Sequence, residues 1–248
     1  MMKKSALRTI AILGIFALSQ LNAAYFVDFR TGDQSEVASF TLTFDVGTGA
    51  IVSGFDVTDP TVTGSFGGSS TGTFSITFTA LGEGTGGSID PANWAFTPAT
   101  GSAFQQSTGA NNGFGIVSDD QTGTNFNNPE GVLFDIDTSG VTFAPGQSLQ
   151  LDSILVRDTN NQFELWKQTG ATSGVNTFSD GGTTDIETWV IASPFNQIAD
   201  GDSYVLRDVG SGQKRFQGIT FSVIPEPSSA FFMGFMSLWI LSFSRRIR

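Results

Sequence analysis

The most regular feature of the chain is an alternation of apolar and polar residues with a period of two. It is clearest in the stretches 40–46, 74–80 and 132–137, where apolar residues, many of them phenylalanine, occupy every second position. Such alternation is typical of a strand with one buried and one exposed face. Five later stretches fit the pattern less strictly: 149–156, 163–166, 186–191, 204–209 and 216–223. Together with the Gly, Asn, Asp and Ser clusters between them, these stretches predict about 10 to 12 strands and no helix in the body of the chain.

Many short antiparallel strands of this kind pack as a β-sandwich or jelly roll. The stretch 82–128 is rich in Gly, Asn, Thr and Gln, and we expect it to form long loops across one end of the sandwich. The chain has no cysteine, so an exported domain of this sequence must be held together by packing alone. We therefore expect one all-β domain, a β-sandwich or jelly roll of antiparallel strands, over residues 24–222.

The first 23 residues have the pattern of a secretory signal peptide. A basic start with Lys3, Lys4 and Arg8 is followed by an apolar run over 10–18 and by small residues at Ala23 and Ala24. Cleavage is expected after Ala23, with Ala24 as the alternative. A first transmembrane helix would need a longer apolar run. The body of the protein is therefore expected to be exported.

The last 26 residues, 223–248, have the pattern of a stop-transfer segment. A stiff, proline-containing spacer precedes an uncharged run over 228–244, and a cluster of arginines ends the chain. At 1.5 Å per residue the run is roughly 25 Å long as a helix, the short end of what spans a bilayer core. The arginines would be held in the cytoplasm. The spacer is Pro225, Glu226 and Pro227, and the arginines are Arg245, Arg246 and Arg248.

The order of these three parts at the extreme C-terminus closely resembles the PEP-CTERM sorting signal. The resemblance covers only the tail. It implies that an exosortase-type membrane protease recognises the motif Pro225-Glu226-Pro227 and cuts near it. The precursor would then be anchored in the membrane by its C-terminal helix. The mature protein would be released to, or attached at, the cell surface or its extracellular polysaccharide matrix.

Removal of both ends leaves a strongly acidic body. Of the 12 Lys and Arg residues, six lie in the terminal segments, whereas all 23 Asp and Glu residues lie within 24–227. The six remaining bases against 23 acids give a formal charge of −17. Phosphate backbones repel such a surface, and the body has no basic stripe. A nucleic-acid partner is therefore excluded.

The absence of histidine and cysteine excludes serine and cysteine hydrolases of the usual kind, which need an imidazole beside the nucleophile. Three stretches match catalytic or nucleotide-binding motifs in letters only: 68–72, 82–87 and 211–214. Each lacks the helix or the companion residues that its chemistry needs, and we interpret all three as turns or loops. No catalytic residue is assigned, and the protein is expected not to be an enzyme.

Acidic residues occur in close pairs, and these pairs leave two alternatives open. Two carboxylates can serve as the acid and base of a secreted glycoside-active enzyme. Asp- and Asn-rich loops also offer oxygen ligands for calcium, although no stretch completes a regular calcium-binding loop. No cofactor and no metal ligand is therefore assigned, with a structural calcium left open. The pairs are Asp119 and Asp120, Asp135 and Asp137, Asp180 and Asp185, and Asp200 and Asp202.

Three tryptophans in the body bear on carbohydrate binding, because exposed aromatic rings can stack on sugars. Trp166 and Trp189 lie in predicted strands, where large aromatic residues are usually core. Trp189 shares a strand face with Glu187 and Ile191, one polar and one apolar, so the sequence leaves open whether it points inward or outward. Trp94 lies in the loop-rich stretch and is the candidate for stacking. The leading hypothesis is a non-enzymatic cell-surface or matrix protein. An extracellular carbohydrate-binding module with polysaccharide as its partner is the first alternative.

Overall fold

The computed structural model shows an all-β protein. It describes residues 23–30, 37–48, 50–54, 70–82, 87–107, 113–117, 130–158, 163–179, 187–210 and 214–225. Within these ranges there is no helix. The strands are β1 (Ala23–Asp28), β2 (Ser39–Asp45), β3 (Ile51–Gly54), β4 (Thr71–Leu81), β5 (Ser88–Asp90), β6 (Ala95–Thr97), β7 (Ala103–Ser107), β8 (Gly113–Val117), β9 (Gly131–Asp137), β10 (Val141–Thr142), β11 (Gln147–Asp158), β12 (Phe163–Gly170), β13 (Ser173–Ser179), β14 (Glu187–Val190), β15 (Gln197–Ile198), β16 (Ser203–Asp208) and β17 (Lys214–Pro225).

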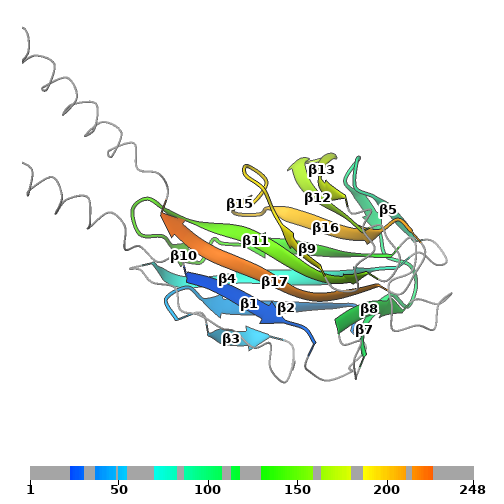
Figure 1. Ribbon diagram of the computed structural model, residues 1–248, viewed down its shortest axis with the longest axis horizontal. Coiled ribbons are helices and arrows are strands. Elements are labelled where there is room, and N and C mark those ends of the chain that lie inside the picture. The colour runs from blue at the N-terminus through cyan, green and yellow to red at the C-terminus, as the bar shows by residue number, and fades with distance from the viewer. Residues whose placement is uncertain are drawn as a thin grey trace, which may run out of the picture.

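The strands form two large antiparallel sheets and one small hairpin (Figure 1). The seven-stranded sheet has the order β14-β11-β17-β8-β7, with β1 beside β17 and β15 beside β11. The eight-stranded sheet has the order β13-β12-β16-β9-β4-β2-β3, with β10 beside β4. Strands β5 and β6 pair only with each other.

The core lies between the two large sheets and is rich in phenylalanine. Rings from the two sheets meet across it. Phe74 of β4 lies 6.0 Å from Phe221 of β17, and Phe78 of β4 lies 6.1 Å from Phe216 of β17, between ring centroids. Phe29, directly after β1, lies 5.4 Å from Phe78. Aromatic pairs at these spacings add to the stabilisation from burial. The prediction of an all-β class with antiparallel sheets is confirmed.

The clearest alternation in the sequence forms the centre of the eight-stranded sheet. Strands β2, β4 and β9 pair in register, so that Leu42, Ile76 and Ile136 lie side by side and are buried. The residues between them face outward, where the hydroxyls of Thr41 and Thr77 lie 2.8 Å apart in a hydrogen bond. The predicted inward and outward faces of these three strands are confirmed.

Strand β11 fits the period-two pattern less well because it contains a β-bulge. Its register with β17 shifts between Leu151 and Ser153. Leu149 and Leu151 are buried before the bulge, and Ile154 and Val156 after it, so the inward positions change from odd to even numbers. One extra residue in a bulge reverses which side chains face the core.

The expected number of strands, about 10 to 12, is too low, because seventeen are formed within the described residues. The stretch 82–128 is expected to form loops, yet β7 and β8 lie within it and extend the seven-stranded sheet.

The glycines of β8 hide this strand in the sequence. Phe114 and Ile116 are buried and alternate with glycines, and glycines are typical of turns. A Cβ on Gly113, at a φ of 134°, would lie 3.0 Å from the carbonyl oxygen of Phe216. Glycine here permits close approach of two strands.

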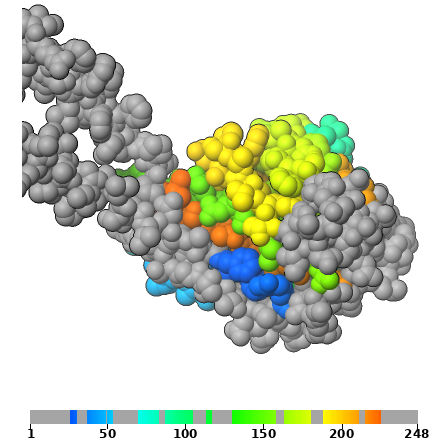
Figure 2. Space-filling model, viewed as in Figure 1, coloured from blue at the N-terminus to red at the C-terminus, as the bar shows by residue number. Residues whose placement is uncertain are grey.

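The two ends of the domain lie beside each other. Strand β1 pairs with β17 from Ala23 opposite Val223 to Asp28 opposite Gly218, and Figure 2 shows β1, in blue, beside β17, in orange. Strand β17 continues to Pro225, which pairs with Gln147. The core reaches past the expected domain end at Ser222, because Val223 is buried.

The predicted signal helix, apart from Ala23, and the transmembrane segment 228–244 lie outside the described residues. No described helix is long and apolar enough to cross a membrane.

At the end of β1, Asp28 accepts hydrogen bonds from the backbone N–H of Arg30 at 2.9 Å and from its Nε at 2.8 Å. Burial alone would raise the pKa of Asp28, but the hydrogen bonds and charge of Arg30 outweigh it and lower that pKa. The stabilisation is therefore complete above the ordinary aspartate pKa of about 3.9 and is lost as the pH falls through the lowered value.

We expect Asp28→Asn to lower the free energy of unfolding by roughly 1 kcal/mol at neutral pH, since Arg30 is partly exposed to solvent. The difference from the wild type should shrink as the pH is lowered from neutrality through the lowered pKa of Asp28. Urea unfolding over this pH range measures it, with Arg30→Met as the matched partner variant. A difference that persists in acid would mean that the effect comes from packing and not from charge.

Candidate functional site

Trp94, the predicted stacking residue, lies in the turn between β5 and β6 and has a positive φ of 49°. Its ring is edge-on to Phe96 at 5.0 Å, and it lies against the backbone of β13. A Cβ on Gly174 would come within 2.8 Å of the indole, and the N–H of Gly174 donates to the carbonyl of Ala92 at 3.2 Å. Trp94 is half-buried and attaches the hairpin to β13. Sugar stacking on it stays a prediction.

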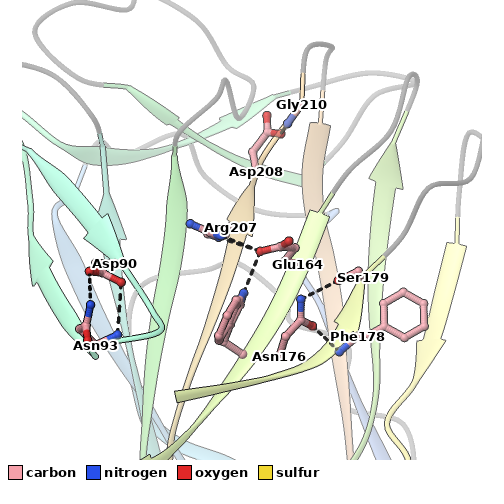
Figure 3. A network of polar contacts seen from close by, with 10 residues as sticks. Asp90, Asn93, Glu164, Asn176, Phe178, Ser179, Arg207, Asp208 and Gly210 are labelled. Carbon is pink, nitrogen blue, oxygen red and sulfur yellow. Dashed lines mark hydrogen bonds and ion pairs between the residues drawn. The ribbon is translucent and has the colours of Figure 1, made fainter. Parts of the chain in front are cut away.

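Trp166, the second tryptophan considered, belongs to a polar network with Glu164 of β12 and Arg207 of β16, whose mutual contact Figure 3 shows. Its indole N–H donates to Glu164 Oε2 at 2.8 Å. Arg207 donates to the same oxygen from Nε at 2.9 Å and Nη2 at 2.7 Å, and its guanidinium lies 5.6 Å from the centre of the Trp166 ring. The Glu164 carboxylate thus links β12 to β16 through Arg207, and it also fixes the Trp166 ring. Trp189, in contrast, is buried in the core.

Two of the predicted acidic pairs lie beside the pairing of β9 with β16, one at the end of β9 and the other directly before β16. Asp137 accepts the N–H of Ser139 at 2.9 Å, and hydrogen bonds from Ser139 lower the pKa of Asp137. Asp200 accepts the N–H of Thr138 at 2.8 Å, and Asp135 accepts a short hydrogen bond from the Ser203 hydroxyl. These carboxylates therefore stabilise turns and strand ends.

The other two predicted pairs, Asp119 with Asp120 and Asp180 with Asp185, lie outside the described residues. Within the described part of the chain, no three acidic side chains come together as a metal site would require. The calcium and glycoside-active alternatives stay predictions.

Of the predicted sorting motif, only Pro225 is described, at the end of β17. Glu226 and Pro227 lie outside the described residues, as do the predicted stop-transfer residues Arg245, Arg246 and Arg248.

The candidate site formed by the described residues is a cleft of about 580 Å³ that is lined by residues from both large sheets. It was not predicted from the sequence. Ser148 enters it from β11 of one sheet and Lys167 from β12 of the other, and the segment that carries β15 supplies the remaining residues. Figure 1 shows this segment projecting beyond the sheets near β11. The residues that line the cleft are Ser148, Lys167, Pro194, Gln197, Ile198, Ala199 and Asp202.

An ion pair forms one wall of the cleft. Lys167 Nζ lies 2.8 Å from Asp202 Oδ2 and donates to the carbonyl of Gln197 at 2.6 Å. Asp202 Oδ2 also accepts the N–H of Ala199 at 2.9 Å. The side chains of Lys167 and Asp202 are 13% and 21% exposed, so both are held in place yet reach solvent. The charges of the pair balance each other.

The segment 194–202 is fixed to both sheets, so the cleft is preformed. Ile198 pairs with Leu149 of β11, and the N–H of Ile136 on β9 donates to the carbonyl of Asp202 at 2.9 Å. The hydroxyl of Tyr204 donates to the carbonyl of Phe195 at 2.7 Å. Burial, with a smaller contribution from the charge of Asp202, raises the pKa of Tyr204. The phenol therefore stays protonated and keeps this hydrogen bond.

One signal in the sequence points to this site. Lys167 follows Phe163 and Leu165 at every second position of β12, and both of these phenylalanine and leucine side chains are buried. A charged residue therefore occupies a position on the inward face, near the end of the strand. Its partner is 35 positions further along the chain, and only the pairing of β12 with β16 brings the two together. The chain matches no protein-family model and no curated protein.

Proposed function

We propose that this chain is an exported, non-enzymatic protein of the cell surface or the extracellular polysaccharide matrix, sorted and processed through its C-terminal tail. An exosortase-type membrane protease is the proposed processing partner. The proposal rests on the signal-peptide pattern over 1–23 and on the resemblance of 223–248 to the PEP-CTERM signal.

The observation that carries the proposal is the fit between the folded domain and the two terminal signals. Strand β1 begins at Ala23, where the signal peptide is expected to end, and β17 ends at Pro225, the first residue of the sorting motif. Ala23 and Val223 are paired neighbours. The described strands thus run from one expected signal to the other, and the two strand ends that adjoin these signals lie side by side.

This arrangement has a consequence for the anchored precursor. Only Glu226 and Pro227 separate the end of β17 from the proposed membrane segment 228–244. The edge of the domain that holds Ala23 and Val223 would therefore face the bilayer closely. A protease embedded in the membrane would find the motif at the membrane surface, next to the folded domain.

The charge and composition of the body favour a non-enzymatic role. A formal charge of −17, from six bases against 23 acids, keeps the domain soluble and away from anionic polymers. The chain has no histidine and no cysteine, so it lacks the residues most often used for nucleophilic and proton-transfer catalysis at neutral pH.

The test is replacement of Pro225, Glu226 and Pro227 by alanine in the full chain, expressed with its processing machinery. The wild type should yield a mature protein that starts at Ala24 or Tyr25 and lacks the residues after the motif. The triple variant should remain in the membrane fraction as an uncut precursor, because export depends on the separate signal peptide. Intact-mass analysis of surface and membrane fractions distinguishes the two products.

A matched control replaces Ser228 and Ser229, which follow the motif directly, by alanine. This variant should be trimmed like the wild type. The proposal fails if the triple variant is also trimmed normally, or if most wild-type molecules retain Arg248.

A further inference from the structure

The cleft beside Lys167 combines polar groups that are open to a ligand with apolar surface. The Ser148 hydroxyl, the Gln197 side-chain amide and Asp202 Oδ1 make no hydrogen bond within the described part of the chain, although all three residues line the cleft. Pro194, Ile198 and Ala199 contribute C–H surface. A volume of about 580 Å³ lies within the range of roughly 300–1,000 Å³ found for small-molecule sites.

We propose that this cleft binds a neutral, hydroxyl-rich ligand, namely a saccharide unit of an uncharged polysaccharide. Each sugar hydroxyl can donate one hydrogen bond and accept another. Asp202 Oδ1 is placed to accept, Lys167 Nζ to donate, and the Ser148 hydroxyl to do either. The apolar side chains of the lining contact the C–H groups of the sugar ring.

The charge balance of the site selects against ionic ligands. Lys167 is neutralised by Asp202 at 2.8 Å, so the cleft offers no unpaired cation to an anion, and the body carries a formal charge of −17. A sulfated or uronate-containing polymer would be repelled at low salt. A metal cation would meet one carboxylate that is already paired with an ammonium group. Hydrogen bonds to a neutral ligand remain the interaction that the site can supply.

The rigidity of the site favours binding despite its small size. The segment 194–202 is bonded to β9 and β11, and the ammonium group of Lys167 also lies 5.2 Å from the centre of the Tyr204 ring. Little conformational freedom is then lost when a ligand binds. A single sugar unit in such a cleft is expected to bind with a Kd on the order of 1 mM, and repeated units of a polymer would raise the avidity.

The test uses the full-length chain in a zwitterionic detergent that carries no sugar headgroup. Saturation-transfer NMR and calorimetric titration with neutral mono- and disaccharides of glucose, galactose, mannose and N-acetylglucosamine give the affinities. Lys167→Met and Asp202→Asn should each weaken binding about tenfold or more, because each removes a charged hydrogen-bonding group. Ala199→Trp should abolish binding by filling the cleft while it leaves the ion pair in place.

The matched control is Arg207→Met, which removes the cation of the other strand-bridging ion pair, on the outward face, and should leave affinity unchanged. Thermal unfolding of each variant identifies any variant that fails to fold. If Lys167→Met or Asp202→Asn does not fold, the binding measured for Ala199→Trp decides the test. The proposal is overturned if no saccharide of the panel binds, if Ala199→Trp binds like the wild type, or if Trp94→Ala alone removes binding, which would place the site at the β5–β6 hairpin. The result is independent of tail processing, which the intact-mass experiment reports separately.

Discussion

Ile76→Asp is expected to abolish folding of the domain. Ile76 is fully buried at the centre of β4, between Leu42 of β2 and Ile136 of β9. An aspartate there would replace a buried apolar side chain by a carboxyl group in the core, at a cost on the order of the 5–15 kcal/mol by which domains are typically stable. Ile76→Ala should fold but lose about 2–5 kcal/mol, because it removes buried methyl groups and leaves a cavity. Circular dichroism and denaturant unfolding measure both effects.

The matched control lies one residue further along the same strand. Thr77 faces outward, is partly exposed, and is paired with Asp135. Thr77→Asp should fold, with a loss of about 1 kcal/mol from repulsion between carboxylates on adjacent strands. Thr77→Asn removes that repulsion and should be closer to the wild type. If aspartate at positions 76 and 77 caused equal damage, both faces of β4 would be buried and the two-layer arrangement would be wrong.

The sequence predicts the strands whose alternation is unbroken. In β2, β4 and β9 every second residue is apolar and no bulge intervenes, so periodicity alone assigns each side chain to its face. Phe40, Phe78 and Phe134 then fall side by side across three strands. Their pairing follows from the shared burial of one face.

Short strands and bulges are not predictable in this way. In β8 only Phe114 and Ile116 carry the pattern, and the glycines that let it approach β17 are also turn residues. In β11 the bulge at Asp152 reverses the phase of the second half of the strand. Both features depend on how neighbouring strands meet, which is a property of the folded chain.

The candidate cleft was missed for the same reason. Lys167 and Asp202 belong to different segments, and no local spacing relates them. The register of β12 with β16 places Lys167 opposite Tyr204, two residues after Asp202. The sequence features on which the proposed function rests, by contrast, are local: the pattern that predicts a signal peptide and the tail that resembles a sorting signal are each contiguous, and both are read without tertiary structure.

The second large effect concerns the boundary between the domain and its tail. A chain that ends at Ser222 should be less stable than one that ends at Pro225 by about 2–4 kcal/mol. It loses Val223, which is 6% exposed in the core and pairs with Leu149. Burial of one valine side chain contributes about 1.5–3 kcal/mol, and the lost ladder with Gln147 and Ser148 adds to it.

Denaturant unfolding of chains over 24–222 and 24–225 measures this difference in stability. Val223→Ala in the longer chain is expected to cost about 2 kcal/mol, and it separates the contribution of the side chain to stability from that of the backbone pairing. The longer chain should match a processed protein isolated from cells. Because loss of Val223 would weaken the core, the proposed processing enzyme would leave the domain intact only if it cuts after Val223. Equal stability of the two chains would instead place the end of the domain at Ser222 and remove this constraint on the cleavage site.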